Sequence, residues 1–182
     1  MIKLANPAPL GLFGFAVTTI MLSLFNVKIF GPVETFPTLM CTAFAFGGSA
    51  QFIAGLLEYP RGNTFGTVAF CSYGSFWWAF ALLISGVVGK IALPVLGAWL
   101  VVWALFTFVM WIATLKSGTK VLQMVFLTLW IAFLLLGLSH LLNMDILHTI
   151  GGWIGFLCGA LAFYLAAAGV INETHEKTVL PI

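Results

Sequence analysis

The residues most suited to binding a polar ligand lie at the start of the first apolar run, in the segment Asn6-Pro7-Ala8-Pro9-Leu10-Gly11-Leu12. Pro7 and Pro9 have a fixed φ and no backbone N–H, so they suit the first turn of a helix, where that donor would be unpaired. Asn6 is then placed as the N-cap. Because a helix N-terminus attracts anions, the segment predicts a helix whose positive end faces a ligand beside Asn6. A plain helix start is the alternative.

The other candidates for ligand binding in the apolar parts of the chain are also uncharged: Thr18, Gln51, Ser72, Tyr73, Ser75 and Gln123. Buried amides are costly to leave unpaired, so Gln51 and Gln123 either join helices or donate to a ligand. The hydroxyl of Tyr73 needs a partner in an apolar environment. A hydrogen bond to a neighbouring helix and a position facing a pore both remain open for it.

The composition determines what kind of element must position these side chains. The chain has 182 residues, of which 62% are hydrophobic and 7% are charged. Apolar runs of about 20 residues, the length that spans a bilayer, recur along it. Only helices satisfy their backbone groups over such runs in lipid, so we expect an all-α integral membrane protein. The net charge of +2 and the lack of a basic patch argue against a nucleic-acid partner.

Gaps between charged residues predict six transmembrane helices, at roughly 9–27, 36–57, 65–89, 93–115, 121–142 and 148–171. The loops are too short for a second domain, so residues 1–182 form one transmembrane domain, with an N-terminal segment 1–8 and a tail 172–182. The positive-inside rule favours cytoplasmic termini. In that orientation five basic residues are cytoplasmic and two, Lys28 and Lys90, are outside; the five are Lys3, Arg61, Lys116, Lys120 and Lys177.

No Asp, Glu, Lys or Arg falls inside the six spans as drawn, which argues against a carboxylate relay or a voltage sensor. The glycines that recur every fourth residue predict close helix packing: Gly151, Gly155 and Gly159. Three isolated cysteines are typical of packing residues rather than disulfides or metal ligands: Cys41, Cys71 and Cys158. His140 and His148, which flank one loop with Asp145, are expected to be interfacial. We therefore expect no metal and no cofactor.

The segment from Asn6 to Leu12 resembles the signature of the acetate uptake transporter family, whose bacterial members are called succinate–acetate permeases. Three further stretches are similar to the same family: Gly62-Asn63-Thr64-Phe65-Gly66, Ser72-Tyr73-Gly74-Ser75-Phe76-Trp77 and Val121-Leu122-Gln123. The resemblance covers nearly the full chain. It implies a permease for acetate, succinate and related small carboxylates in the cell membrane, assembled as a homohexamer with one path in each protomer.

In that family a narrow hydrophobic constriction is formed by a Phe, a Tyr and a Leu. Matched motif by motif, these residues fall on Phe15, Tyr73 and Leu129 of this chain. Phe15 lies one helical turn after Gly11, on the same helix face. Without the resemblance, ordinary apolar packing would be the preferred interpretation of Phe15 and Leu129.

The residues leave the mode of transport open. Removing a carboxylate from water costs several kcal/mol, and one helix N-terminus returns only about 0.3–1 kcal/mol, so Asn6 alone cannot carry the anion. Protonating an acid whose pKa is roughly 4–5 costs about 3–4 kcal/mol at pH 7. Because the two routes are close in energy, channel-like anion flow and proton-linked transport both remain possible.

Two other functions are considered. Asn-Pro-Ala also occurs in aquaporin-like neutral-solute channels, but those use two such half-helices at mid-membrane and this chain has one, near its end. The segment Gly47-Gly48-Ser49-Ala50, together with His140, suggests an intramembrane serine hydrolase only faintly. We therefore do not expect an enzyme.

Overall fold

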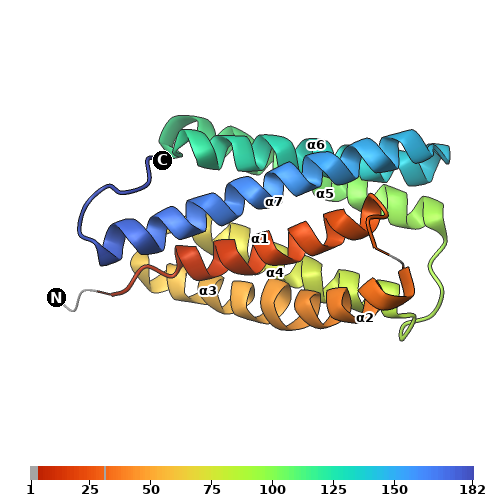
Figure 1. Ribbon diagram of the computed structural model, residues 1–182, viewed down its shortest axis with the longest axis horizontal. Coiled ribbons are helices and arrows are strands. Elements are labelled where there is room, and N and C mark those ends of the chain that lie inside the picture. Colours follow the sequence, from red (N-terminus) through yellow and green to blue (C-terminus); the bar gives the residue numbers. More distant parts are fainter. Residues whose placement is uncertain (1–3, 31) are drawn as a thin grey trace.

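The computed structural model describes residues 4–30 and 32–182 (Figure 1). In this part of the chain, six helical segments are long and apolar enough to cross a bilayer. Five are single helices: α1 (Ala8–Asn26), α4 (Thr64–Ser85), α5 (Leu93–Ser117), α6 (Lys120–Leu142) and α7 (Asp145–Thr174). The sixth is a composite span, Phe36–Arg61. The predicted all-α membrane fold with six transmembrane helices is confirmed; Lys3 lies outside the described residues.

The composite span begins in α2 (Pro32–Thr42) and continues through the π-helical segment η1 (Ala43–Ala50), α3 (Gln51–Glu58) and the short 3₁₀ turn η2 (Tyr59–Arg61). In η1 the carbonyl of Phe44 accepts hydrogen bonds from Ser49 Oγ (2.9 Å) and Trp78 Nε1 (3.2 Å). The charge gap predicted that this span ends at residue 57, but in the structure it continues to Arg61. It carries Glu58 as its last α-helical residue.

Other helix ends also differ from the predicted ones. α4 ends at Ser85 rather than residue 89, because Gly86 has a left-handed φ of 75° and caps the helix. α7 covers Asp145–Thr174 and is longer than the predicted span at both ends. Asn63 caps α4, since its Oδ1 accepts a hydrogen bond from the Gly66 N–H at 3.0 Å.

The start of α1 is shifted by one residue from the prediction. Pro7, not Asn6, is the N-cap, because α1 begins at Ala8; Pro7 itself has a φ of −83° and a ψ of −11°. The carbonyl of Pro7 accepts a hydrogen bond from the Gly11 N–H at 3.3 Å. Asn6 still serves this helix end, since its Oδ1 accepts a hydrogen bond from the Ala8 N–H at 3.1 Å.

The six spans lie side by side in one bundle (Figure 1). The buried core between them is rich in aromatic side chains. α7 packs against both α1 and α6, α5 packs on α6, and α1 and α4 both contact η1 and α3. Gly159 lets α7 approach α1, because a Cβ there would lie 2.7 Å from Ile20 Cγ1. The outward face of α5 is apolar, as lipid requires, with Val102 and Leu105 62% and 63% exposed.

Candidate functional site

A cavity of about 240 Å³, the first cavity, opens at the end of the bundle where α1 begins. It is lined by residues of α1, α3, α4, α6 and α7, so five of the six spans contribute to it. Five of the nine predicted site residues line it: Asn6, Phe15, Gln51, Tyr73 and Leu129. The cavity is mostly apolar, and it is large enough for a small organic molecule rather than a single water.

Residues of the predicted constriction lie at the closed end of the first cavity. Along each helix, Phe15, Tyr73 and Leu129 are the lining residues farthest from the mouth. They are 5%, 3% and 5% exposed, and the Phe15 and Tyr73 ring centroids are 6.0 Å apart. The structure therefore brings together three residues that are far apart in the sequence.

The hydroxyl of Tyr73 is engaged by a neighbouring helix. It donates a hydrogen bond to Thr107 Oγ1 on α5 at 2.8 Å, and Thr107 Oγ1 donates in turn to the Trp103 carbonyl at 2.7 Å. From the sequence, a hydrogen bond to a neighbouring helix and a position facing a pore were alternatives for Tyr73. The structure shows that Tyr73 makes such a hydrogen bond and also lines a cavity. The fixed hydroxyl orients the Tyr73 ring across the bundle.

A second cavity, of about 170 Å³, lies toward the opposite end of the bundle and includes Phe76, Phe133 and His140 in its lining. Tyr73 and Phe76 are three residues apart on α4, which is a rise of ~4.5 Å. Leu129 and Phe133 on α6 are separated by ~6 Å. On these two helices, a single layer of side chains separates the cavities.

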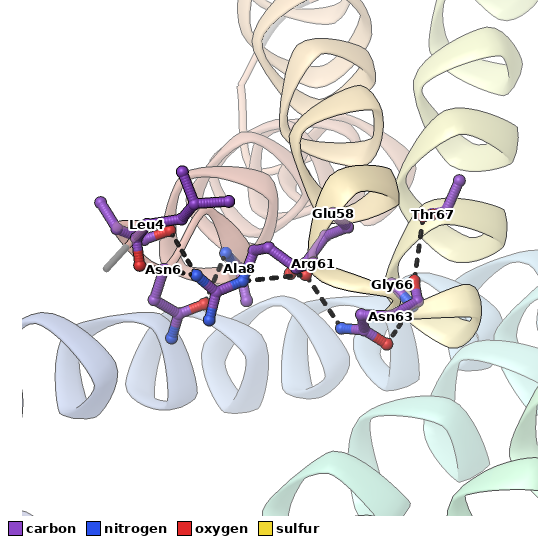
Figure 2. Close-up of polar contacts among 9 residues, drawn as sticks. Leu4, Asn6, Ala8, Glu58, Arg61, Asn63, Gly66 and Thr67 are labelled. Carbon is purple, nitrogen blue, oxygen red and sulfur yellow. Dashed lines mark hydrogen bonds and ion pairs between the residues drawn. The ribbon is translucent and has the colours of Figure 1, made fainter. Parts of the chain in front are cut away.

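Glu58 and Arg61 are the charged pair at the mouth of the first cavity (Figure 2). Arg61 Nη1 donates to the carbonyls of Leu4 and Ala5 at 2.8 Å each, and Arg61 Nε lies 3.7 Å from Glu58 Oε2. Asn63 Nδ2 donates to the same Glu58 oxygen at 3.0 Å. The pair thus ties Leu4 and Ala5, which directly precede the signature segment, to the turn between α3 and α4.

Glu58 is the residue that the sequence analysis missed. It lines the first cavity, is 1% exposed, and its Oε1 has no hydrogen-bond partner in the described part of the chain. Gln51 lies seven residues earlier on the same face of α3, is also 1% exposed, and has an unpartnered Oε1. The predicted second span ended at residue 57 and so left Glu58 outside; that bound is wrong, because the helix continues past residue 57 and buries this carboxyl.

Four of the predicted site residues are not among the described residues that line either cavity: Thr18, Ser72, Ser75 and Gln123. Thr18 and Ser75 donate to carbonyls one turn back on their own helices, those of Gly14 (2.8 Å) and Cys71 (2.9 Å). Gln123 Nε2 donates to the carbonyls of Thr114 and Gly118 at 3.3 and 3.1 Å, so it joins α6 to the end of α5.

The histidines lie in the second cavity rather than in a metal cluster. The rings of His140 and His148 have centroids 5.3 Å apart, and His148 Nδ1 lies 3.3 Å from Ser139 Oγ. Among the described residues, no group of three His, Cys, Asp or Glu side chains could hold a metal ion. Ser49 Oγ donates a hydrogen bond to the Phe44 carbonyl, while His140 packs edge-to-face against His148, so Ser49 and His140 do not form a catalytic pair.

Comparisons with known proteins agree in family and in fold. The model of the GPR1/FUN34/yaaH family matches residues 1–182. A succinate-acetate/proton symporter of Escherichia coli K12, SatP, is 48% identical over 99% of this chain and 96% of its own. Acetate permease A of Emericella nidulans is 37% identical over 99% of this chain and 66% of its own. The structure of the bacterial acetate channel SatP superposes with a TM-score of 0.93 at 45% identity, covering 99% of each chain.

Proposed function

Because the chain belongs to the GPR1/FUN34/yaaH family, as its signature segment predicted, we propose that it carries acetate and related small carboxylates, succinate among them, across the cell membrane. The observation that carries this proposal is the pair of cavities, which enter the bundle from opposite ends and which, on α4 and α6, are separated by one layer of side chains. Each protomer then holds its own path.

We assign the constriction of this path to Phe15, Tyr73 and Leu129, and its polar lining to Asn6 and Gln51. Water in both cavities would keep the acid hydrated up to the constriction, so the desolvation that costs several kcal/mol is confined to one short step. Thr18, Ser75 and Gln123 act in helix structure in this proposal, since they donate to backbone carbonyls outside the cavities. Ser72 is not assigned to the path, because it is not among the described residues that line either cavity.

We propose that the protein is a homohexamer in the cell membrane, and that the first cavity of each protomer opens on the cytoplasmic side. Arg61, Lys116, Lys120 and Lys177 flank the helix ends at that side, which fits the positive-inside rule. The location draws support from the bacterial symporter. The hexamer rests on the family resemblance, and chemical cross-linking of the protein in native membranes tests it.

A neutral-solute channel is not favoured. α1 starts at the rim of the bundle and crosses it as one helix of 19 residues, so its Asn-Pro-Ala segment is not the tip of a half-helix at mid-membrane. The relatives compared above are named for succinate and acetate. Stopped-flow swelling of vesicles in glycerol measures the alternative directly.

Uptake of labelled acetate and succinate into proteoliposomes tests the proposal, with protein-free liposomes as the blank because acetic acid itself permeates lipid. Leu129→Trp places a larger side chain at the closed end of the first cavity and should block uptake. Val102→Trp, on the lipid-facing side of α5, is the matched control because Val102 is 62% exposed. Equal uptake by both variants would contradict the assigned path.

A further inference from the structure

The carboxyl of Glu58 has two oxygens in different situations. Oε2 accepts from Asn63 Nδ2 and faces the Arg61 guanidinium, whereas Oε1 is buried and has no hydrogen-bond partner among residues 4–30 and 32–182. Buried polar groups in proteins are nearly always hydrogen-bonded, so an orphaned carboxyl oxygen on a residue that lines a cavity points to a ligand that donates to it. Figure 2 shows the paired side of this carboxyl, where Arg61 and Asn63 converge on it.

The local backbone provides the space for this carboxyl. Gly62 has a left-handed φ of 72°, which ends η2 and lets Asn63 turn back to cap α4. Gly66 lies against the Glu58 side chain, since a Cβ there would be 2.9 Å from Glu58 Cγ and 3.0 Å from Cδ. The conformation of the turn and the missing side chain at Gly66 together place one buried carboxylate at the mouth.

The proposed substrate is itself a carboxylic acid. Its protonation state decides whether its carboxyl group can form a hydrogen bond with the carboxyl group of Glu58. An ionised carboxylate has only acceptors and repels a second one at contact distance. A protonated acid brings one O–H donor, and two carboxyl groups that share a single proton form a stable pair with one negative charge. The guanidinium of Arg61, 3.7 Å from Glu58 Oε2, balances that charge.

We propose that Glu58 shares one proton with each acid that enters the first cavity and is thereby the residue through which a proton accompanies the substrate. This inference rests on the proposed function. The acid donates its O–H to Glu58 Oε1; when the proton moves across, the O–H bond of the acid breaks as that of Glu58 forms. The transfer reverses before the acid leaves, so Glu58 is regenerated and the neutral acid crosses the constriction, where the Tyr73 hydroxyl is already bonded to Thr107.

The surroundings of Glu58 hold few other groups that could take this role. Arg61 faces it from η2, and Tyr73 on α4 is the other ionisable side chain among the described residues that line the cavity. The described lining from α1, α6 and α7 is without acidic or basic side chains. Among the described side chains that line the cavity, Glu58 is therefore the one carboxyl that can accept a proton entering with the substrate.

The test uses Glu58→Gln, which keeps the shape of the side chain and removes its ability to exchange a proton. Labelled acetate uptake into proteoliposomes is driven either by an outside-acid pH gradient or by a membrane potential, inside positive, with protein-free liposomes subtracted. Wild type should respond to the pH gradient and not to the potential. In Glu58→Gln the pH-driven uptake should fall by about a hundredfold or more, which is the scale of a lost acid–base group.

Two further variants make the outcome decisive. Glu173→Gln removes an exposed carboxylate at the same end of the bundle and should keep the wild-type response. Glu58→Asp keeps an exchangeable proton, so it should retain the ratio of pH-driven to potential-driven uptake even if its total uptake falls or Glu58→Gln fails to fold. Three outcomes would overturn the assignment of Glu58. They are wild-type uptake that responds to the potential alone, a ratio of pH-driven to potential-driven uptake in Glu58→Gln equal to that of the wild type, and a fall of this ratio in Glu58→Asp. Wild-type uptake no faster than in protein-free liposomes would instead overturn the proposed function.

Discussion

Substitutions of Tyr73 distinguish two possible roles of this residue: its ring could close the path, or its hydroxyl could bind the substrate. Its hydroxyl already donates to Thr107 Oγ1 at 2.8 Å, and Thr107 has its own acceptor in the Trp103 carbonyl. Tyr73→Phe therefore removes one buried hydrogen bond and leaves the Thr107 donor satisfied. The expected loss of stability is about 0.5–1.5 kcal/mol, with acetate uptake close to that of the wild type.

Tyr73→Ala should behave differently, because it removes the ring that closes the first cavity. The ring is 3% exposed, so its loss should destabilise the protein by about 3–5 kcal/mol, as truncation of a buried aromatic does. The second cavity begins at Phe76, ~4.5 Å further along α4, so the two cavities should join. Carboxylates bulkier than acetate, such as butyrate, should then gain uptake relative to acetate.

Both variants are measured by thermal unfolding in detergent and by uptake of labelled acetate and butyrate into proteoliposomes. For a chain of this size a loss of 1 kcal/mol corresponds to a shift in Tm of about 2–4 °C. Loss of acetate uptake in Tyr73→Phe, with the protein still folded, would mean that the hydroxyl contacts the substrate. An unchanged ratio of butyrate to acetate uptake in Tyr73→Ala would refute the view that one layer separates the cavities.

Three further variants probe the mouth and the scaffold. Asn63→Ala removes the N-cap of α4 together with a donor to Glu58, and should lower stability by about 0.5–2 kcal/mol in thermal unfolding; an unchanged Tm would contradict the capping role. Arg61→Lys cannot reproduce the guanidinium geometry and should speed proteolysis of the N-terminal segment, whereas protection equal to that of the wild type would speak against the tie to Leu4 and Ala5. Gln123→Leu loses two hydrogen bonds and should lower Tm with acetate uptake preserved; lost uptake in the folded variant would return it to the path.

Much of the fold could be predicted from the sequence because the bilayer restricts the possible elements. The apolar runs require helices, and the gaps between charges locate the spans to within a few residues. The error at the second span has a specific cause: an acidic residue ends a hydropathy run, although the helix continues through Glu58. The spacing of Gln51 and Glu58, two turns apart on one helix face, was the signal that could have identified the carboxyl as inward-facing.

The candidate site was harder to predict, because helices that are apolar all round do not show which face meets the cavity. Phe15, Tyr73 and Leu129 came from the family resemblance, and the structure brings them together at one end of a cavity. Gln123 has the same amide as Gln51, but only the three-dimensional structure shows that its partners are backbone carbonyls at the end of α5. The partners of such side chains come from segments distant in the sequence, so local pattern could not assign them.

The central claim is that acids pass through the constriction between the two cavities, and thiol modification at Leu129 tests it most directly. Leu129→Cys is placed in a background in which Cys41, Cys71 and Cys158, all free thiols, are replaced by alanine. A thiol reagent applied from the Asn6 end should abolish acetate uptake, and added acetate should slow the reaction. Complete modification of Cys at this position with undiminished uptake would contradict the path described here.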